Sequence, residues 1–359
     1  MSQSTTSDEA EELAATVRAV FADHPTEVFS ERLWSTLSEL GLTRLTLPEA
    51  AGGSGGSLAD AATVLLVAGA AAAPVPLAET DLLAGWLLHT AGLPVPDGPL
   101  AIATDGQLAV SAAGDGVAVS GRLRRVGWAR HASRVAVLAA GPHGADLVLS
   151  LDPAMQGVRL TEGTNLAGEP RDDLTLDLRV AAADIAPAPE HGRELLARRA
   201  ALARALLLAG AAGTALARAV CYAGERAQFG RPIGRFQAVQ QQLALAAAEV
   251  AAGRAAVEAA VRIAATAADG PPLAGPDAEL AVAVAKARTS QAAGAVARIA
   301  HQVHGAIGFT QEHDLRLATT RLWAWRDEDG NETHWHTLIA HRALLEGPDG
   351  LWPLLTRAN

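Results

Sequence analysis

The sequence predicts an α+β protein with an N-terminal helical domain, a middle β-barrel or β-sandwich domain and a C-terminal four-helix bundle. Three observations predict this class. Apolar residues recur at helical spacing in the first part of the chain, short apolar runs alternate with glycines in the middle, and long Ala-rich segments follow. We therefore expect domains at 1–96, 97–190 and 191–359.

The N-terminal domain is expected to hold at least three helices. A capping-box pattern, Thr6 followed by Glu9, precedes apolar positions at helical spacing and predicts the start of the first helix. Leucines repeat the pattern from Leu33 to Leu40, and Gly41 stops it. A third helix is expected through Leu58–Ala72.

The middle domain has the sequence pattern of strands. Short apolar runs at Val117–Val119, Val135–Leu138 and Leu147–Leu151 lie between glycine-rich turns. The alternation of Leu174, Leu176 and Leu178 with polar residues predicts a strand with one buried face.

The C-terminal domain is predicted to be helical. Ala-rich segments at 194–223, 238–268, 276–305 and 313–325 are separated by glycine and proline, as at Gly270-Pro271-Pro272. This is the pattern of a helical bundle.

Composition argues against several classes of partner. The formal net charge of −10 does not favour nucleic acid or anionic membranes. The single cysteine, Cys221, cannot form an intrachain disulfide, and the acidic N-terminal segment does not resemble a signal peptide. The longest apolar tracts carry charged or proline residues, so we expect buried helices and no membrane span. The cytoplasm is the expected location.

The first chemically informative motif is Arg226-Ala227-Gln228-Phe229-Gly230-Arg231-Pro232-Ile233, followed by Phe236-Gln237. Arginine offers a planar fork of donors that matches phosphate oxygens, Phe229 offers an apolar face, and Gln237 can donate and accept hydrogen bonds. The string is more specific than a lone surface arginine beside a turn.

The second motif is His301-Gln302-Val303-His304-Gly305-Ala306-Ile307-Gly308-Phe309. A rival interpretation is a metal site made by His301 and His304, with His313, His334 and His336 nearby in sequence. No carboxylate or cysteine arrangement accompanies these histidines, so we expect packed or solvated imidazoles and no metal.

In this order the two motifs resemble those of the flavin-dependent acyl-CoA dehydrogenase family, and Leu47-Pro48-Glu49 with Gly52–Gly56 resembles a further family segment. The resemblance implies FAD as cofactor. It implies that Arg226 meets the flavin pyrophosphate of a neighbouring subunit, that Phe229 and Gln237 line the same dinucleotide, and that Gln302, Gly305 and Gly308 face its adenosine half. It also implies α,β-dehydrogenation of an acyl-CoA substrate and an electron-transfer flavoprotein as acceptor.

The family's catalytic base is not obvious in this chain. In one branch a glutamate precedes a glycine, and an ungapped count places Asp329-Gly330 there, with Glu328 as an alternative. Aspartate reaches about 1.5 Å less than glutamate, and catalytic geometry tolerates misplacement of only about 1 Å. In another branch the count points to Ala200, which cannot act as a base. The family's flavin-ring segments are also missing between Leu100 and Arg134, where Val126–Ala129 is the nearest feature.

The residues that match serve a partner's flavin in the family, whereas the missing ones serve the chain's own flavin and substrate. We therefore predict one subunit of a hetero-oligomer, whose related partner supplies the base. Two alternatives stay open: a homo-oligomer that uses Asp329 or Glu328, and a non-catalytic scaffold subunit. The acyl group, a fatty acid or a steroid side chain, is not specified.

Overall fold

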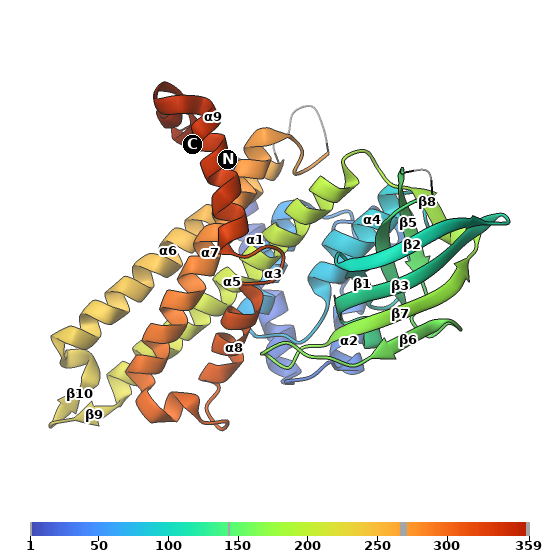
Figure 1. Cartoon of the computed structure of the whole chain (residues 1–359). Helices are drawn as coiled ribbons and strands as arrows, with labels where there is room; N and C mark the ends of the chain where they lie inside the picture. The colour runs from blue at the N-terminus through green and yellow to red at the C-terminus, as the bar shows by residue number, and fades with distance from the viewer. Residues whose placement is uncertain (1, 143, 266–270, 357–359) are drawn as a thin grey trace. The chain divides into compact units, whose positions relative to one another are not determined.

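The computed structural model describes residues 2–142, 144–265 and 271–356, and these form two compact units. The helical unit comprises Met1–Glu27, Leu58–Ala73 and Ala201–Asn359, and the β unit comprises Val28–Ser57 and Pro74–Ala200. Helices precede and follow a middle β region along the chain, as predicted (Figure 1). The three-domain boundaries at 96 and 190 stay a prediction.

The β unit contains two four-stranded sheets. One has the order β1-β4-β5-β8, with β1 (Leu100–Ala103), β4 (Arg134–Ala140), β5 (Asp146–Leu151) and β8 (Ile185–Pro187). The other has the order β2-β3-β7-β6, with β2 (Gly106–Ala113), β3 (Gly116–Gly127), β7 (Arg171–Val180) and β6 (Val158–Thr161). Strands β1 and β4 are parallel, and the other pairs are antiparallel. One apolar cluster takes residues from both sheets, so the unit is a β-sandwich.

Strand β7 confirms the alternation predicted from sequence. Leu174, Leu176 and Leu178 are buried, whereas Asp177 is exposed. Successive side chains of a strand point to opposite faces, so one face of β7 reaches the sandwich core.

Short helices complete the β unit: α2 (Glu31–Glu39), η1 (Glu49–Ala51), η2 (Glu79–Gly85), α4 (Trp86–Thr90), η3 (Ala129–His131) and η4 (Ala182–Asp184). The Ser30 side chain caps α2 by accepting a hydrogen bond from Leu33 N at 3.3 Å. Element η2 is a π-helix that buries Glu79 and Asp81. Such elements are rare outside functional sites, and the apolar sequence pattern did not predict one here.

The helical unit consists of α1 (Ser2–Asp23), α3 (Leu58–Ala70), α5 (Gly192–Glu225), α6 (Gln237–Ala265), α7 (Gly275–His304), α8 (Leu315–Trp325) and α9 (Glu332–Thr356). Its short elements are β9 (Ala227–Gln228), β10 (Arg231–Pro232), η5 (Ile233–Arg235) and η6 (Gly305–Phe309). The division between the two units falls within α5, after Ala200. Helices α6 and α7 run side by side (Figure 1). Close approach needs small residues: a Cβ at Gly210 of α5 would lie 2.1 Å from Leu66 O of α3.

One sequence prediction about helices was wrong, and one helix was not predicted. Helix α1 begins at Ser2, so Thr6 lies inside it and the predicted capping box does not mark its start. Once nucleated, a helix extends cheaply through polar residues, which is why the local signal failed. The second miss is α9, because Gly347 (φ 68°), Pro348 and Pro353 interrupt its pattern. The predicted end of the 238–268 helix, together with Gly270, lies outside the described residues.

Helix α5 has the length and apolarity of a membrane span, by composition alone, within the described part of the chain. Of its most apolar window, 78% is buried inside the protein. Its alanines pack in one core cluster with residues of α7 and α8. We therefore describe α5 as a core helix, as the sequence predicted.

Candidate functional site

A tight hairpin between α5 and α6 carries the first motif. Strands β9 and β10 pair through Gln228 with Arg231 and through Ala227 with Pro232. Phe229 and Gly230 form the two-residue turn with φ of 51° and 78°, the left-handed values that such a hairpin requires. The Phe229 side chain is 92% exposed, although its ring lies edge-on to that of Phe236. The hairpin therefore presents an aromatic face to solvent.

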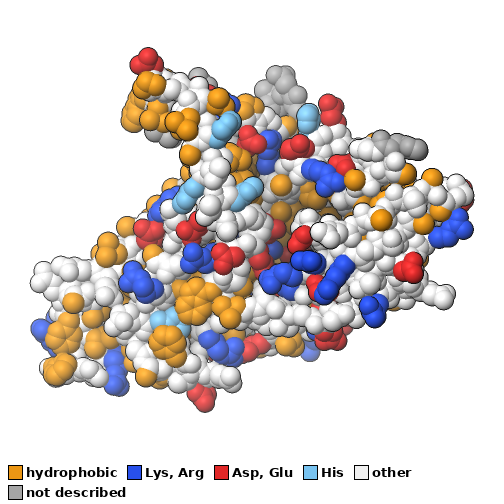
Figure 2. All heavy atoms as spheres, in the orientation of Figure 1, with side chains coloured by type: hydrophobic (Ala, Val, Ile, Leu, Met, Phe, Trp, Pro, Cys, Tyr) orange, Lys and Arg blue, Asp and Glu red, His pale blue; other side chains and the backbone are white. Residues whose placement is uncertain are grey.

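Basic side chains surround this aromatic face. Arg226, Arg231 and Arg235 are all exposed, and the Arg231 guanidinium lies 4.3 Å from the centre of the Phe236 ring. Figure 2 shows apolar and basic side chains together at the end of the helical unit where β9 and β10 lie. This is the donor set that a phosphate-bearing ligand with an aromatic base requires.

The second motif meets the first at Gln302. This exposed side chain lines a hollow of about 330 Å³ with Phe229 and Phe236, and a second hollow of about 480 Å³ with Gly305 and Phe309. Arg298 and Trp323 complete the wall of the second hollow. Folding thus brings residues of the two motifs, distant in sequence, to one surface.

Gly305 and Gly308, two glycines of the second motif, have different surroundings. Gly305 adopts φ 64° and ψ −147°, which is open almost only to glycine, and a Cβ there would meet no atom within 4 Å. It therefore leaves space on the ligand side. Gly308 is buried, and a Cβ there would lie 2.9 Å from the Cβ of His304. This glycine therefore allows η6 to pack closely against α7.

The residues present fit a flavin dinucleotide. Phe229, Gln302 and Gly305 line the hollows, while Arg226 and Gln237 are exposed at the base of the neighbouring hairpin and at the start of α6. Guanidinium and amide groups suit the pyrophosphate and the polar edges, and the gap left at Gly305 suits close backbone approach. When bound, FAD supplies the hydride-accepting chemistry. The roles of Arg226, Phe229, Gln237, Gln302, Gly305 and Gly308 stay predictions.

The two candidate bases share one arginine. Arg204 of α5, only 7% exposed, donates from Nε to Asp329 Oδ2 at 2.8 Å, and its Nη1 lies 3.3 Å from Glu328 Oε2. Asp329 also adopts φ 56°, an uncommon value for aspartate. Both carboxylates are therefore committed to a structural ion-pair network.

Lys286, the only lysine of the chain, forms hydrogen bonds to the loop that carries these carboxylates. Its Nζ is fully buried and donates to Ser290 Oγ (3.0 Å), Arg326 O (3.0 Å) and Gly330 O (2.8 Å). Burial lowers the pKa of Lys286 to about 8, although Asp329 opposes this shift. The three donors of the ammonium are all used, so Lys286 fixes both ends of the loop.

Sequence reasoning missed Arg204 and Lys286. A usable signal existed, because each is a cation inside an Ala-rich apolar segment, where burial demands a partner. A single lysine among 29 basic residues was a second signal. Neither signal identifies the partner, which comes from a distant part of the sequence.

The histidines of the second motif are packed. His301 Nε2 lies 2.9 Å from Thr319 Oγ1, and His304 Nδ1 donates to Ala300 O at 2.7 Å. The described residues contain no group of three or more His, Cys, Asp or Glu placed to hold a metal ion. These contacts match the packed interpretation of the two imidazoles.

The Val126–Ala129 segment of the β unit is also accounted for by packing. Trp128 is 3% exposed, and its ring lies 6.4 Å from the rings of both Phe29 and His131. A buried indole is not available to cover a flavin ring.

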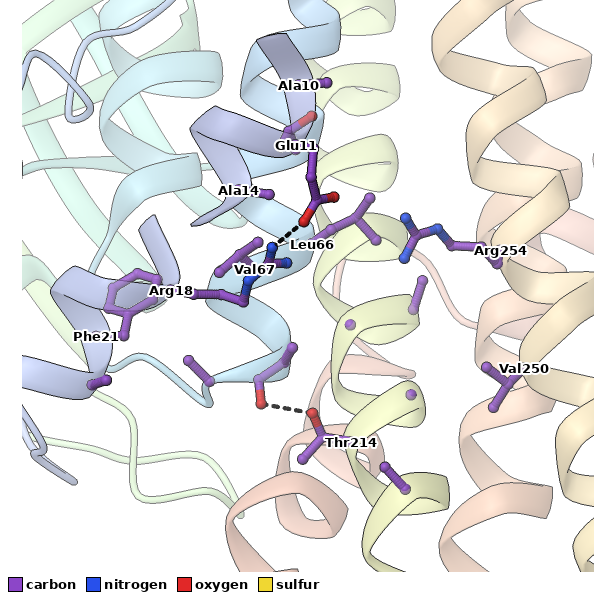
Figure 3. A pocket seen from close by; sticks show the side chains of 18 residues that line it. Ala10, Glu11, Ala14, Arg18, Phe21, Leu66, Val67, Thr214, Val250 and Arg254 are labelled. Atoms are coloured by element: carbon purple, nitrogen blue, oxygen red, sulfur yellow. Dashed lines mark hydrogen bonds and ion pairs between the residues drawn. The ribbon is translucent and has the colours of Figure 1, made fainter. Parts of the chain in front are cut away.

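A third hollow, of about 810 Å³, lies between α1, α3, α5 and α6 (Figure 3). Its walls are mostly small and apolar, and Arg18 on its rim is paired with Glu11. None of the predicted site residues lines it. We do not assign it to the dinucleotide.

Comparison with known proteins shows the family of the chain. The family models described as acyl-CoA dehydrogenase, N-terminal domain, and acyl-CoA dehydrogenase, C-terminal domain, match residues 2–94 and 190–344. Acyl-CoA dehydrogenase IpdE2 of Mycolicibacterium smegmatis is 31% identical over 330 residues, which cover 87% of this chain and 91% of that protein.

Two solved structures have similar folds over nearly the whole chain. The ChsE4–ChsE5 complex from Mycobacterium tuberculosis gives a TM-score of 0.85 at 26% identity, covering 94% of this chain and 98% of that chain. A Tcur3481–Tcur3483 steroid ACAD variant gives 0.79 at 26% identity, covering 94% and 99%. The chain therefore belongs to the acyl-CoA dehydrogenase family of FAD-dependent oxidoreductases.

Proposed function

We propose that this chain takes part in the α,β-dehydrogenation of an acyl-CoA thioester as one subunit of a hetero-oligomer. In this reaction a base takes the α-proton of the thioester while a hydride leaves the β-carbon for the flavin. The chain contributes Arg226, Phe229, Gln237, Gln302 and Gly305 to a dinucleotide surface. A related acyl-CoA dehydrogenase subunit supplies the base.

The observation that carries the proposal is the pairing of Arg204 with Asp329 and Glu328. A general base must reach the proton it abstracts and must not be held elsewhere. Here one buried guanidinium holds both carboxylates, and the loop between them and α9 is fixed by Lys286 and Trp335. By contrast, the dinucleotide surface is exposed and open to a partner.

The similar proteins favour a bulky acyl group and a two-subunit assembly. One similar structure is a ChsE4–ChsE5 complex, and another is a steroid ACAD of two named chains. We propose a steroid-derived or long acyl group by this analogy, and an electron-transfer flavoprotein as acceptor by family resemblance. The single free thiol, Cys221, is exposed and fits a reducing cytoplasm.

Two other functions make different demands on the same residues. A self-sufficient homo-oligomer would need Asp329 or Glu328 to leave Arg204 during turnover. A non-catalytic scaffold would need no dinucleotide contact at all. The exposed Phe229 and the glycine-only conformation of Gly305 favour the proposed function over the scaffold.

The test is to purify the full chain alone and co-expressed with related subunits from the same genome. Flavin absorbance and turnover are measured with straight-chain acyl-CoA and with steroid-carboxyl CoA thioesters. We expect activity only in the co-expressed form. Arg226→Ala in this chain should lower the bound flavin, whereas Arg159→Ala, an exposed arginine of β6, should not.

Base assignment is tested in the same complex. Asp329→Asn and Glu328→Gln should leave a rate of the same order, because neither carboxylate takes the proton. A yellow, active protein from the chain alone would contradict the proposal. So would a loss of turnover of about a hundredfold or more in either carboxamide variant.

A further inference from the structure

The loop η6, which carries the second motif, lies directly on two buried histidines of α7. His301 and His304 are 6% and 4% exposed. A Cβ at Gly308 would lie 2.9 Å from His304 Cβ and 3.4 Å from His301 Nδ1, and the Phe309 ring stacks on His301 at 4.3 Å. The two imidazoles thus lie directly beneath the loop that begins at Gly305, and Gln302 precedes that loop in the last turn of α7.

The hydrogen bond of His304 fixes which ring nitrogen carries the proton in its neutral form. A carbonyl only accepts, so His304 Nδ1 must carry the proton that it donates to Ala300 O at 2.7 Å. Its Nε2 is then the unprotonated nitrogen. A second proton on this ring would create a new donor in the buried space beneath η6.

His301 and His313 are constrained in a similar way. His301 uses Nε2 with Thr319 Oγ1 at 2.9 Å, and its Nδ1 is buried without a hydrogen-bond partner in the described structure. His313 Nδ1 accepts the backbone N–H of Leu315 at 3.1 Å. A second proton on His301 would therefore occupy a buried nitrogen that has no acceptor among the described residues, so the packing beneath η6 favours the neutral His301 ring.

Two of the charged and titratable neighbours of His304, which are His313 and Arg218, also disfavour its protonation. The neighbours around His304 are His301 on α7, His313 with its ring centre 4.8 Å away, and Arg218 and Tyr222 on α5, whose ring stacks at 4.6 Å. The Asp314 carboxylate lies 3.6 Å from the Arg218 guanidinium, so it partly offsets the electrostatic effect of Arg218 on His304.

Burial is the main cause of the shifts. It lowers the pKa of His304, and His313 and Arg218 act in the same direction against the bond to Ala300. Burial likewise lowers the pKa of His301, with His304 and His313 adding to the effect.

We propose that His301 and His304 are positioning residues for the flavin-dinucleotide loop, which keeps its binding geometry only while both imidazoles are neutral. The inference rests on the proposed role of Gln302 and Gly305 in binding FAD. Neither histidine needs to touch the cofactor. Acidification protonates His301 and His304. The charged rings displace η6 from the position described above, and the affinity for the dinucleotide falls.

The size of the effect follows from proton linkage. A histidine with the ordinary value of about 6.5 in the open loop is protonated in a ratio of roughly ten to one at about pH 5.5. Closing the loop must first remove that proton, so flavin affinity should fall about tenfold for each histidine. Little change is expected above about pH 7.5.

The experiment uses the co-expressed, flavin-loaded complex. Samples are equilibrated at about pH 7.5, 6.5 and 5.5, desalted, and their retained flavin is measured by absorbance. Wild type should lose flavin at the acid end, whereas His301→Leu and His304→Leu should each flatten that dependence. His341→Gln, at an exposed position on α9, is the matched control and should behave as wild type. An unchanged pH profile in both leucine variants overturns the proposal.

A second measurement does not depend on flavin. In the flavin-free chain, ring-labelled histidines are titrated by NMR while the backbone amides of Gly305 and Gly308 are followed. Titration of His301 and His304 below the ordinary histidine value, together with movement of both amides, supports the proposal even if the leucine variants bind no flavin. Titration at the ordinary value, or amides that do not move, overturns it. Coupled titration in a wild type that never retains flavin supports the loop coupling and contradicts the proposed function.

Discussion

The Asp329 carboxylate lies 2.8 Å from Nε of Arg204, a residue 125 positions earlier in the chain. This ion pair occupies the part of the sequence where the resemblance implies a catalytic base. Since both side chains are largely buried, dissolved salt screens the pair only weakly.

Removing the guanidinium should release a base. We expect the double variant Arg204→Ala with Asp329→Glu to gain acyl-CoA turnover in flavin-loaded complexes whose partner base has been removed. The glutamate restores about 1.5 Å of reach, and the alanine frees it. Turnover is measured by dye reduction. Asp329→Glu alone is the control and should stay inactive, because Arg204 still holds the carboxylate. An equal gain of turnover in both variants would show that Arg204 does not restrain the carboxylate at position 329.

Lys286 should be a large contributor to stability. Lys286→Met leaves Arg326 O and Gly330 O without its two hydrogen bonds, and we expect the free energy of unfolding to fall by about 2 kcal/mol or more. Lys286→Arg should not rescue it, because a planar fork cannot replace a compact ammonium among three convergent acceptors. Urea unfolding followed by circular dichroism measures both. If the Lys286→Met variant were as stable as wild type, the hydrogen bonds of Lys286 would not stabilise the fold as argued.

Asp81 should make stability depend on pH. Its Oδ1 accepts from Thr46 N and Thr46 Oγ1, both at 2.9 Å, and burial raises its pKa from 3.8 to about 6, against these bonds and Arg199. Between these values the folded state binds more protons than the unfolded state, so this group lowers stability as pH rises from about 4 to about 6.

The variant Asp81→Asn keeps an oxygen acceptor and removes the charge. Its stability relative to wild type should therefore increase by about 3 kcal/mol between pH 4 and pH 7. Thermal unfolding at several pH values measures this difference. Asp115→Asn, at an exposed position, is the control and should show no such trend. A constant difference for Asp81→Asn across the range would contradict the argument.

Two glycine-to-alanine changes should have opposite signs. Gly305→Ala forces a side chain into φ 64°, ψ −147°, so we expect a loss of about 1–3 kcal/mol in the free energy of unfolding and lower flavin occupancy. Gly213→Ala lies within α5 where a Cβ meets no atom within 4 Å, and should gain about 0.5–1 kcal/mol. Chemical unfolding with flavin quantification measures both. Equal changes in the free energy of unfolding for the two variants would show that the backbone conformation of Gly305 does not disfavour a side chain there.

Local patterns predicted the elements of this fold well. The alternating leucines of β7 and the Ala-rich segments of α5 to α8 report burial through their own periodicity, so no distant residue was needed to recognise them. The family resemblance implied that both motifs serve one dinucleotide, and in the structure Gln302 lines hollows with residues of both motifs.

The polar network was beyond the same reasoning. Arg204 and Asp329, or Lys286 and Gly330, meet only because separate helices pack together, and no spacing in the sequence encodes that pairing. For the same reason, the sequence does not predict that Asp329 pairs with Arg204 of α5.

The burial of Lys286 has a chemical consequence for a protein that handles acyl thioesters. Thioesters acylate unprotonated amines, and the only ε-amine of this chain is fully enclosed and hydrogen-bonded three times. Arginine guanidinium groups, which provide every other cationic side chain apart from histidine, stay protonated and are poor nucleophiles. The folded chain therefore offers an activated acyl donor no lysine to modify, whatever the acyl group it carries.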